Sequence, residues 1–167
     1  MVVRTLVSEH DYLHTAGEGP EPDYVDGEVI ERTMPNYAHS KAQRRLMRWF
    51  STLAQSAPVF ESAEIRLQVA PQRYRVADLA VFFGKEPKDP VPELCPLVVA
   101  EIVSPDDFHQ DIMTKLKDYA GIGVPHIWLI NPGDQTIYTF EDRSLKCVLA
   151  FDLPELQASI TAEQILG

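Results

Sequence analysis

The spacing of apolar residues changes along the chain between the periods typical of strands and of helices. Alternation with polar residues, or a short apolar run, indicates a strand, and a spacing of three to four indicates a helix. The predicted strands are a hairpin at 23–33 that turns at Asp26-Gly27, the segments 59–60, 65–69, 74–83, 97–103 and 126–130, and an antiparallel pair at 136–140 and 146–151. The predicted helices are 8–14, 38–55, about 106–121 and a capping helix within the acidic tail 154–167, with Thr161 and Gln164 as a cap pair. Together they predict a single α/β domain with a central mixed sheet flanked by helices.

The helix predicted at 38–55 has two faces. Its apolar side, which should pack on the sheet, consists of Ala42, Leu46, Trp49, Phe50 and Leu53. Its other side carries four cations, Lys41, Arg44, Arg45 and Arg48. That basic side is either a solvated helix face or a surface that contacts phosphates. His39 falls on the packing side, where it is either a buried core histidine or a ligand.

Two predicted strands each contain one acid among apolar neighbours. Asp78 lies within 74–83, and Glu101 interrupts 97–103, the most apolar strand of the chain. A buried charge is costly unless something pairs with it, so each acid needs a partner. On the following helix Lys115 borders the packing stripe, whereas Lys117 points away from it, so Lys115 is the lysine directed at the sheet.

Two carboxylates and a lysine brought together in this way can serve phosphodiester chemistry. Carboxylate oxygens suit Mg²⁺, which takes only one or two of them from a protein and keeps several waters. A bound cation can polarise a phosphodiester, and a neighbouring lysine can orient or deprotonate water or offset phosphate charge. The alternative is a buried ion cluster in which Asp78, Glu101 and Lys115 only satisfy one another.

Composition narrows the choice of partners. The 167 residues carry a formal net charge of −10, which by itself disfavours a nucleic acid. Residues 32–75 are the exception, with eight bases against two acids. Only Cys95 and Cys147 are present, so we expect no disulfide framework. No apolar run could span a bilayer and no signal peptide is evident, so a cytoplasmic location is expected.

Several motifs occur in an order that resembles a known family. They are Tyr24-Val25-Asp26-Gly27-Glu28, His39, Arg75-Val76-Ala77-Asp78, Val99-Ala100-Glu101-Ile102-Val103-Ser104-Pro105, the spaced trio Asp111, Lys115 and Tyr119, and the run from Gly123 to Pro132. This set is similar to the Uma-type restriction endonucleases of the PD-(D/E)XK nuclease superfamily. The resemblance implies a restriction-endonuclease-like fold, with a catalytic core at 34–132 between an N-terminal helix and hairpin (1–33) and C-terminal strands and capping segment (133–167).

The resemblance also assigns roles to residues. Asp78 and Glu101 would be catalytic and hold Mg²⁺, or Mn²⁺, with the backbone carbonyl of Ile102. The superfamily's usual lysine position is Val103, so Lys115 would take that role from the helix. The auxiliary candidates are Glu28, which is alternatively a surface charge of the hairpin, His39, and Tyr119, which either contacts substrate or packs. The chain departs from the family pattern at Asp23, Ala77 and Asn131.

The implied activity is endonucleolytic hydrolysis of DNA. Arg73 and Arg75, with the basic helix face, would contact phosphates, and by analogy the protein would act as a homodimer. The alternative is a catalytically inactive module of the same fold that binds nucleic acid or a protein partner. The sequence leaves the DNA target and strandedness open.

Overall fold

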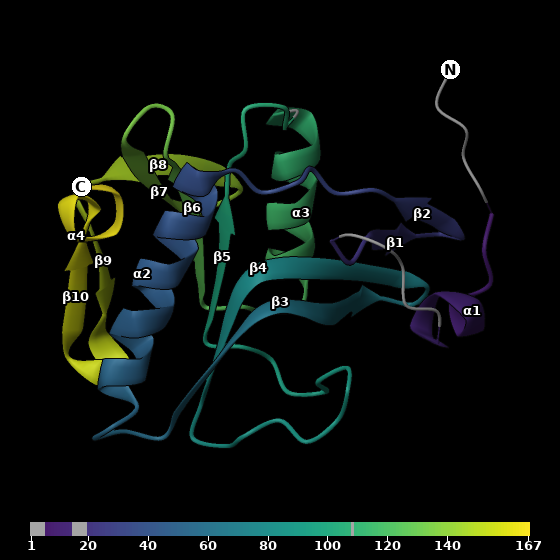
Figure 1. Ribbon diagram of the computed structural model, residues 1–167. Helices are drawn as coiled ribbons and strands as arrows, with labels where there is room; N and C mark the ends of the chain where they lie inside the picture. The colour runs from purple at the N-terminus through teal and green to yellow at the C-terminus, as the bar shows by residue number, and fades with distance from the viewer. Residues whose placement is uncertain (1–5, 15–19, 108) are drawn as a thin grey trace.

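A computed structural model describes residues 6–14, 20–107 and 109–167 (Figure 1). Its centre is an eight-stranded mixed sheet in the order β2-β1-β4-β5-β6-β7-β8, with β3 paired to β4 outside this path. The elements of this sheet and its helices are α1 (Glu9–His14), β1 (Asp23–Val25), β2 (Glu28–Ile30), α2 (Tyr37–Leu53), β3 (Val59–Ala70), β4 (Arg73–Phe83), β5 (Val98–Ile102), α3 (His109–Gly121), β6 (His126–Asn131), β7 (Thr136–Glu141) and β8 (Ser144–Val148). Only β5 and β6 run parallel, and the other neighbours in this sheet are antiparallel, so the predicted fold class is confirmed.

Strand β4 organises the sheet because three strands pair with it. One edge pairs with β3 along nearly its whole length, from Arg73 to Phe83. The opposite edge pairs with β1 at Arg73 and Tyr74, and with β5 at Leu79 to Val81. Between these two partners, residues 75–78 have no strand beside them in the described part of the chain. The fold therefore leaves a short open edge in the middle of its sheet.

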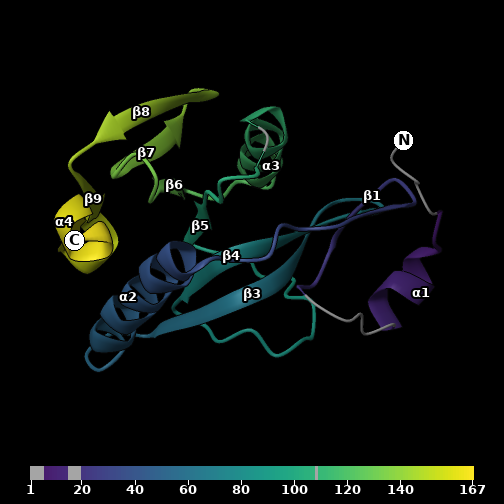
Figure 2. The same ribbon diagram turned by 45° about the horizontal axis from the view of Figure 1, so that its top comes forward.

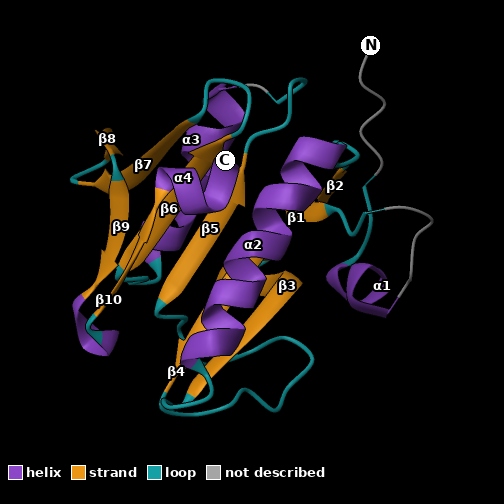
Figure 3. Cartoon of the chain, turned by 60° about the vertical axis from the view of Figure 1, so that its left-hand side comes forward, coloured by secondary structure: helices purple, strands orange, loops and turns teal. Residues whose placement is uncertain are grey.

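The two long helices cover opposite faces of this sheet, as Figures 2 and 3 show for α2 and α3. Helix α2 buries Ala42, Leu46 and Phe50 in a core that includes Leu79 and Trp128. Helix α3 buries Leu116 and Tyr119 in a second core that includes Val99 and Leu129. The apolar stripes that predicted these helices are the faces that pack.

Local hydrogen bonds and turns start several elements, and the hairpin turns at Asp26-Gly27 as predicted. Ser8 Oγ accepts a hydrogen bond from the Asp11 backbone at 3.0 Å, ahead of α1. The hairpin turns through Asp26 at φ 51° and Gly27 at φ 93°, the positive values that a two-residue turn requires. Helix α2 begins after Asn36, whose side chain accepts from the His39 backbone at 2.9 Å. The segments predicted as 59–60 and 65–69 are one strand, β3, with Glu64 at φ 52° inside it.

The C-terminal part differs from the prediction. The strand expected at 146–151 is wrong as one unit, because β8 ends at Val148 and β9 (Ala150–Leu153) leaves the main sheet to pair with β10 (Ala158–Thr161). Leu149, between them, is 87 % exposed, so the chain turns outward there. The first part of the tail 154–167 is a 3-10 turn (Pro154–Leu156) followed by β10. Only α4 (Ala162–Leu166) is α-helical, and its Thr161–Gln164 capping box is as predicted.

Other expectations concern the chain as a whole. Cys95 and Cys147 are both free and exposed, as the lack of a disulfide framework predicted. In the part of the chain that the structure describes, the helices are too short or too polar to cross a bilayer.

Stacked rings fasten the second sheet to the first. The rings of Trp128 on β6 and Phe151 on β9 are 4.2 Å apart and nearly parallel, and both side chains are buried.

Replacing Phe151 with alanine should therefore lower the free energy of unfolding by about 3–5 kcal/mol, from lost burial and the cavity left behind. Urea denaturation followed by tryptophan fluorescence measures this. The matched control, Leu149→Ala, should change stability by less than about 0.5 kcal/mol because Leu149 is exposed; equal losses in both variants would contradict the packing described.

Candidate active site

The open edge of β4 is closed by side chains instead of a strand. The backbone N–H of Val76 donates to Asp23 Oδ1 at 2.7 Å, and the carbonyl of Val76 accepts from Lys115 Nζ at 3.0 Å. A buried strand cannot leave these groups unpaired, so both side chains serve the backbone as hydrogen-bond partners. Asp23 sits at the first position of β1, and Lys115 reaches across from α3. The structure thus places a carboxylate and an ammonium group where a strand is missing.

Asp78 and Glu101 face each other at this edge. They lie one residue beyond the paired residues Leu79 and Ala100, so the antiparallel register sets the two acids opposite each other. Asp78 is 2 % exposed and Glu101 is 7 % exposed. Asp78 Oδ2 accepts from the backbone N–H of Ile102 at 2.7 Å, which ties the end of β5 to β4. The spacing of strand residues therefore builds a buried carboxylate pair.

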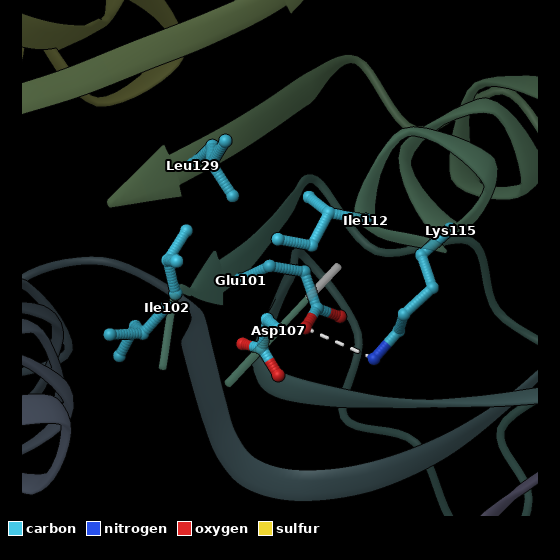
Figure 4. A pocket seen from close by; sticks show the side chains of 7 residues that line it. Glu101, Ile102, Asp107, Ile112, Lys115 and Leu129 are labelled. Atoms are coloured by element: carbon cyan, nitrogen blue, oxygen red, sulfur yellow. Dashed lines mark hydrogen bonds and ion pairs between the residues drawn. The ribbon is translucent and has the colours of Figure 1, made fainter. Parts of the chain in front are cut away.

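Both oxygens of Glu101 receive hydrogen bonds from α3. Lys115 Nζ lies 3.1 Å from Oε2, and the Tyr119 hydroxyl donates to Oε1 at 2.6 Å. In Figure 4 the side chains of Glu101 and Lys115 point toward one another from β5 and α3. Burial raises the pKa of Glu101 to about 7, in spite of the nearby ammonium of Lys115. Glu101 therefore holds a proton more readily than an ordinary glutamate.

Lys115 is the cation of this group. Burial alone would lower its pKa, but the carboxylates of Glu101, Asp23 and Asp78 outweigh burial and raise the pKa above the usual value. Its Nζ is also 3.7 Å from Asp23 Oδ2. Lys115 is accordingly protonated at neutral pH and acts as a positive charge and hydrogen-bond donor. It is not set up as a base.

Asp78 stays ionised because cations surround it. Burial would raise the pKa of Asp78, but its hydrogen bond with His39 and the charges of Lys115 and Arg32 hold that pKa below the usual range. His39 Nε2 is 3.3 Å from Oδ2, and Arg32 Nη2 donates to Oδ1 at 2.5 Å. Burial would lower the pKa of His39, but the hydrogen bond to Asp78 and the negative charges of Asp78 and Glu64 together raise that pKa above its usual value.

A cavity of about 690 Å³ opens beside the open edge. Its walls come from the β1–β2 hairpin, the segment leading into α2 and its first turn, residues 75 and 78 of β4, the end of β5, the loop between β5 and α3, and the first turns of α3. Acids outnumber cations in the lining. The acids are Asp23, Glu28, Glu31, Asp78, Glu101, Asp106, Asp107 and Asp111, and the cations are Arg32, Arg75 and Lys115. A smaller pocket of about 20 Å³, drawn in Figure 4, lies next to Glu101 and Val103, with room for about one water molecule.

The structure brings most of the predicted site residues together. The side chains of Asp78, Glu101 and Lys115 line this single cavity, with Ile102, His39 and Glu28 also in its wall. His39 is the buried histidine that its place on the packing side indicated, and it also contacts Asp78. Tyr119 is fully buried and does not line the cavity, so it holds Glu101 and does not contact a ligand there.

The cations predicted to contact phosphates are more dispersed. On α2, Arg44 and Arg48 are exposed, whereas Lys41 and Arg45 reach the carbonyls of Leu166 and Ile165 at 3.5 and 3.3 Å. These carbonyls end α4, where a positive charge is favourable. Of the four cations expected on this face, two are exposed to solvent and two are partly buried against α4. None of the four lines the cavity.

The expectation that Arg73 and Arg75 form part of an exposed basic surface needs correction. Arg75 is 5 % exposed and pairs with Asp118 at 2.7 Å and Asp23 at 3.2 Å. Arg73 pairs with Asp26 at 2.9 Å and Asp118 at 3.3 Å. Each guanidinium is held by two carboxylates, so both hold β4 to the hairpin and to α3.

Arg32 lines the cavity and contacts Asp78, and the sequence did not single it out. It follows β2 in a segment with no helix or strand period, and its partner Asp78 is 46 residues away. Its guanidinium also pairs with Glu64 on β3. Glu64 in turn accepts from Gln43 Nε2 at 2.9 Å, and the same nitrogen donates to the Asp78 carbonyl at 2.8 Å. The only sequence signal was that a buried Asp78 needs a cation.

The donor set suits a hard divalent cation. Among the described residues, no three His, Cys, Asp or Glu side chains are grouped so that they could hold a metal together. Mg²⁺ does not need three, because it keeps several waters and takes one or two carboxylates. Asp78 and Glu101 are adjacent carboxylates on one cavity, beside Ile102, and Asp78 is held ionised. These residues fit Mg²⁺ or Mn²⁺, although protein donors engage both carboxylates.

The fold and the sequence of this chain are both similar to those of known proteins. A solved structure, "a putative nuclease belonging to DUF820" from Anabaena variabilis, matches with a TM-score of 0.82 and 18 % identity, covering 96 % of this chain and 97 % of that one. This likeness shows the fold. The model of the Uma2 family, described as "Putative restriction endonuclease", matches residues 9–163. The chain therefore belongs to the Uma2 family, and this family supports a nuclease. No curated protein matches the sequence.

The hydrogen bond from Tyr119 to Glu101 can be tested without disturbing packing. Tyr119→Phe removes only the hydroxyl and leaves Glu101 Oε1 without its donor in a buried site. The free energy of unfolding should fall by about 1–3 kcal/mol, measured by urea denaturation at pH 8. Tyr37→Phe is the control, because Tyr37 is 75 % exposed, and should change stability by less than about 0.5 kcal/mol. A Tyr119→Phe variant as stable as the control would show that the bond does not hold Glu101.

Proposed function

We propose that this protein is an endonuclease that hydrolyses phosphodiester bonds in DNA with the help of Mg²⁺, for which Mn²⁺ can substitute. The observation that carries the proposal is that Asp78, Glu101 and Lys115 line one cavity at the open edge of β4. Membership in the Uma2 family supports the reaction class. The choice of DNA follows from the description of the family as a restriction endonuclease, and the choice of metals follows from the carboxylate donors of the site.

The acids would bind the metal. Asp78 and Glu101 would supply carboxylate oxygens, and the carbonyl of Ile102 would be a third donor. When bound, the metal would polarise the scissile phosphate and lower the pKa of a bound water. Tyr119 fixes the orientation of Glu101 through its 2.6 Å hydrogen bond, and His39 contacts Asp78 Oδ2.

Lys115 would act on the phosphate as a cation. Its ammonium is anchored by Val76 and Glu101, so its position is set before substrate arrives. A fixed positive charge in a buried site stabilises the negative charge that develops on a phosphate during displacement. Because its pKa is raised, Lys115 holds or orients a water by donating a hydrogen bond, and does not remove a proton from it.

DNA must reach a cavity whose lining is acidic. Negative charge around the site repels a polyanion, so cations in the medium should matter for binding as well as for chemistry. Arg44 and Arg48, the fully exposed pair on α2, are the residues we propose for sequence-independent phosphate contacts outside the cavity. A homodimer would present two such sites to the two strands, by analogy with restriction-type nucleases.

One observation favours a second function, that of an inactive module with the same fold. Every oxygen of Asp78 and Glu101 already has a protein hydrogen-bond donor or cation beside it. A site satisfied in this way is also what an inactive module would have, in which the acids and Lys115 only stabilise the sheet. Such a module would bind nucleic acid or a protein partner without cutting.

Cleavage separates the two readings. Supercoiled plasmid incubated with the purified chain and Mg²⁺ or Mn²⁺ should be nicked, and nicking should fall at least about a hundredfold in Asp78→Asn and in Lys115→Met, since each removes a charge from the reacting centre. Lys117→Met, two positions along α3 and exposed, should cut like the wild type. Circular dichroism checks that each variant is folded. No cleavage of DNA or RNA by the wild type with any divalent ion would favour the inactive module.

Salt dependence tests the proposed phosphate contacts. If Arg44 and Arg48 bind phosphates, DNA affinity should fall steeply between 50 and 200 mM salt, since counterions are released on binding. The double variant Arg44→Glu, Arg48→Glu should flatten the plot of log affinity against log salt by about two slope units. Fluorescence anisotropy with a labelled duplex, with Asp78→Asn as the protein to prevent cutting, measures both. Affinity that does not respond to salt would argue against phosphate contacts.

A further inference from the structure

One oxygen of Asp78 is paired with a guanidinium that also binds a second acid. Arg32 Nη2 lies 2.5 Å from Asp78 Oδ1, and Arg32 Nη1 pairs with Glu64. The Arg32 side chain is 13 % exposed, and that of Asp78 is 3 % exposed. The other oxygen, Oδ2, is engaged by Ile102 and His39. Arg32 lines the same cavity as Asp78, so a cation that approaches Asp78 Oδ1 from solution meets Arg32 there.

Arg32 belongs to a strap, residues 31–36, that links β2 to α2 along the wall of the cavity. Next to Arg32, Thr33 Oγ1 donates to Asp107 Oδ1 at 3.0 Å, which joins the strap to the loop between β5 and α3. Asp107 Oδ2 also accepts from the Ser104 backbone at 2.7 Å. The strap is thus fixed on both sides of the carboxylate pair, and Arg32 is its contact with Asp78.

Glu64 gives Arg32 a second place to bind. It lies on β3 between Ala63 and Ile65, which pair with Leu79 and Ala77, so it is opposite Asp78. Its backbone is left-handed, at φ 52°, an uncommon conformation for a strand residue. Its side chain is 41 % exposed, so a guanidinium that stays with Glu64 and leaves Asp78 can be partly hydrated. When the Arg32 guanidinium releases Asp78, it is therefore not left as a buried positive charge without a partner.

We propose that Arg32 is an internal cation that competes with the divalent metal for Asp78, so that metal binding requires the guanidinium to leave Asp78 while it keeps its pair with Glu64. This inference rests on the proposed function, because it takes Asp78 as a metal ligand. Two cations at one carboxylate oxygen repel each other, so each lowers the affinity of the other. Arg32 thereby sets how much free metal the site needs.

Metal affinity without DNA tests the competition. Titration of the full-length chain with Mn²⁺, followed by the electron paramagnetic resonance signal of the free ion, should show about tenfold tighter binding for Arg32→Gln than for the wild type, a coupling of ordinary size. Lys117→Gln removes the same charge from an exposed position on α3 and should bind within about twofold of the wild type, because solvent screens it. Arg32→Lys keeps a charge but loses the fork that reaches both acids, and should lie between.

The outcomes are distinct. Equal or weaker binding by Arg32→Gln would overturn the competition, as would an equal gain in Lys117→Gln. If Arg32→Gln does not fold, Arg32→Lys decides, since binding no tighter than the wild type would contradict the proposal. Asp78→Asn separates this inference from the proposed function. Mn²⁺ binding that is unchanged in Asp78→Asn would remove the proposed metal site, whereas binding lost in Asp78→Asn but unchanged in Arg32→Gln would overturn the role of Arg32 alone.

Discussion

The open edge of β4 is the constraint on which the rest of the structure depends. A buried strand with one edge unpaired over four residues must have the backbone groups of that edge satisfied in another way. Asp23 and Lys115 do this at Val76, and both are charged. Charges placed there require countercharges, which Arg75 and Glu101 supply. The gap in hydrogen bonding thus brings charged side chains into the centre of an apolar sheet.

The charged side chains at the open edge of β4 therefore both stabilise the fold and form the candidate site. Removing one partner from a buried pair leaves the other uncompensated, which commonly costs about 3–5 kcal/mol. A loss of activity in a single variant is therefore weak evidence for catalysis unless folding is measured beside it. Substitutions that keep shape, such as asparagine for Asp78, and exposed neighbours such as Lys117 separate the two effects. The same reasoning explains why Tyr119, which lies outside the cavity, still matters to Glu101.

The sequence reveals the parts of this site that lie on regular elements. Asp78 and Glu101 are visible because each interrupts an apolar strand, and helical spacing distinguishes Lys115 from Lys117. Arg32 has no such signal, because the segment after the hairpin has no period that would orient it. The failed prediction of one strand at 146–151 has a similar cause. The composition is strand-like throughout, and only the structure shows that β9 leaves the main sheet to pair with β10, where Phe151 packs against Trp128.

The excess of basic residues in segment 32–75 also gave a misleading indication of a basic surface. The basic segment 32–75 suggested a phosphate-binding surface, but within it Arg32, Arg66, Arg73 and Arg75 all form ion pairs with acids from elsewhere in the chain. Such pairs join residues more than 40 positions apart, a separation that a local count cannot detect. The cations left fully exposed on α2 are Arg44 and Arg48. Only these two remain as exposed positive charges of the kind that the count of bases predicted for the whole of segment 32–75.

The central claim is that the carboxylate pair at the open edge of β4 binds a divalent metal. A crystal of the protein soaked in Mn²⁺, with diffraction recorded at a wavelength where manganese scatters anomalously, tests it most directly. The account predicts an anomalous peak in contact with Asp78 and Glu101, with the Arg32 guanidinium off Asp78 and still paired with Glu64. A peak that appears only at the acidic surface, or none at saturating Mn²⁺ with Arg32 still on Asp78, would contradict it.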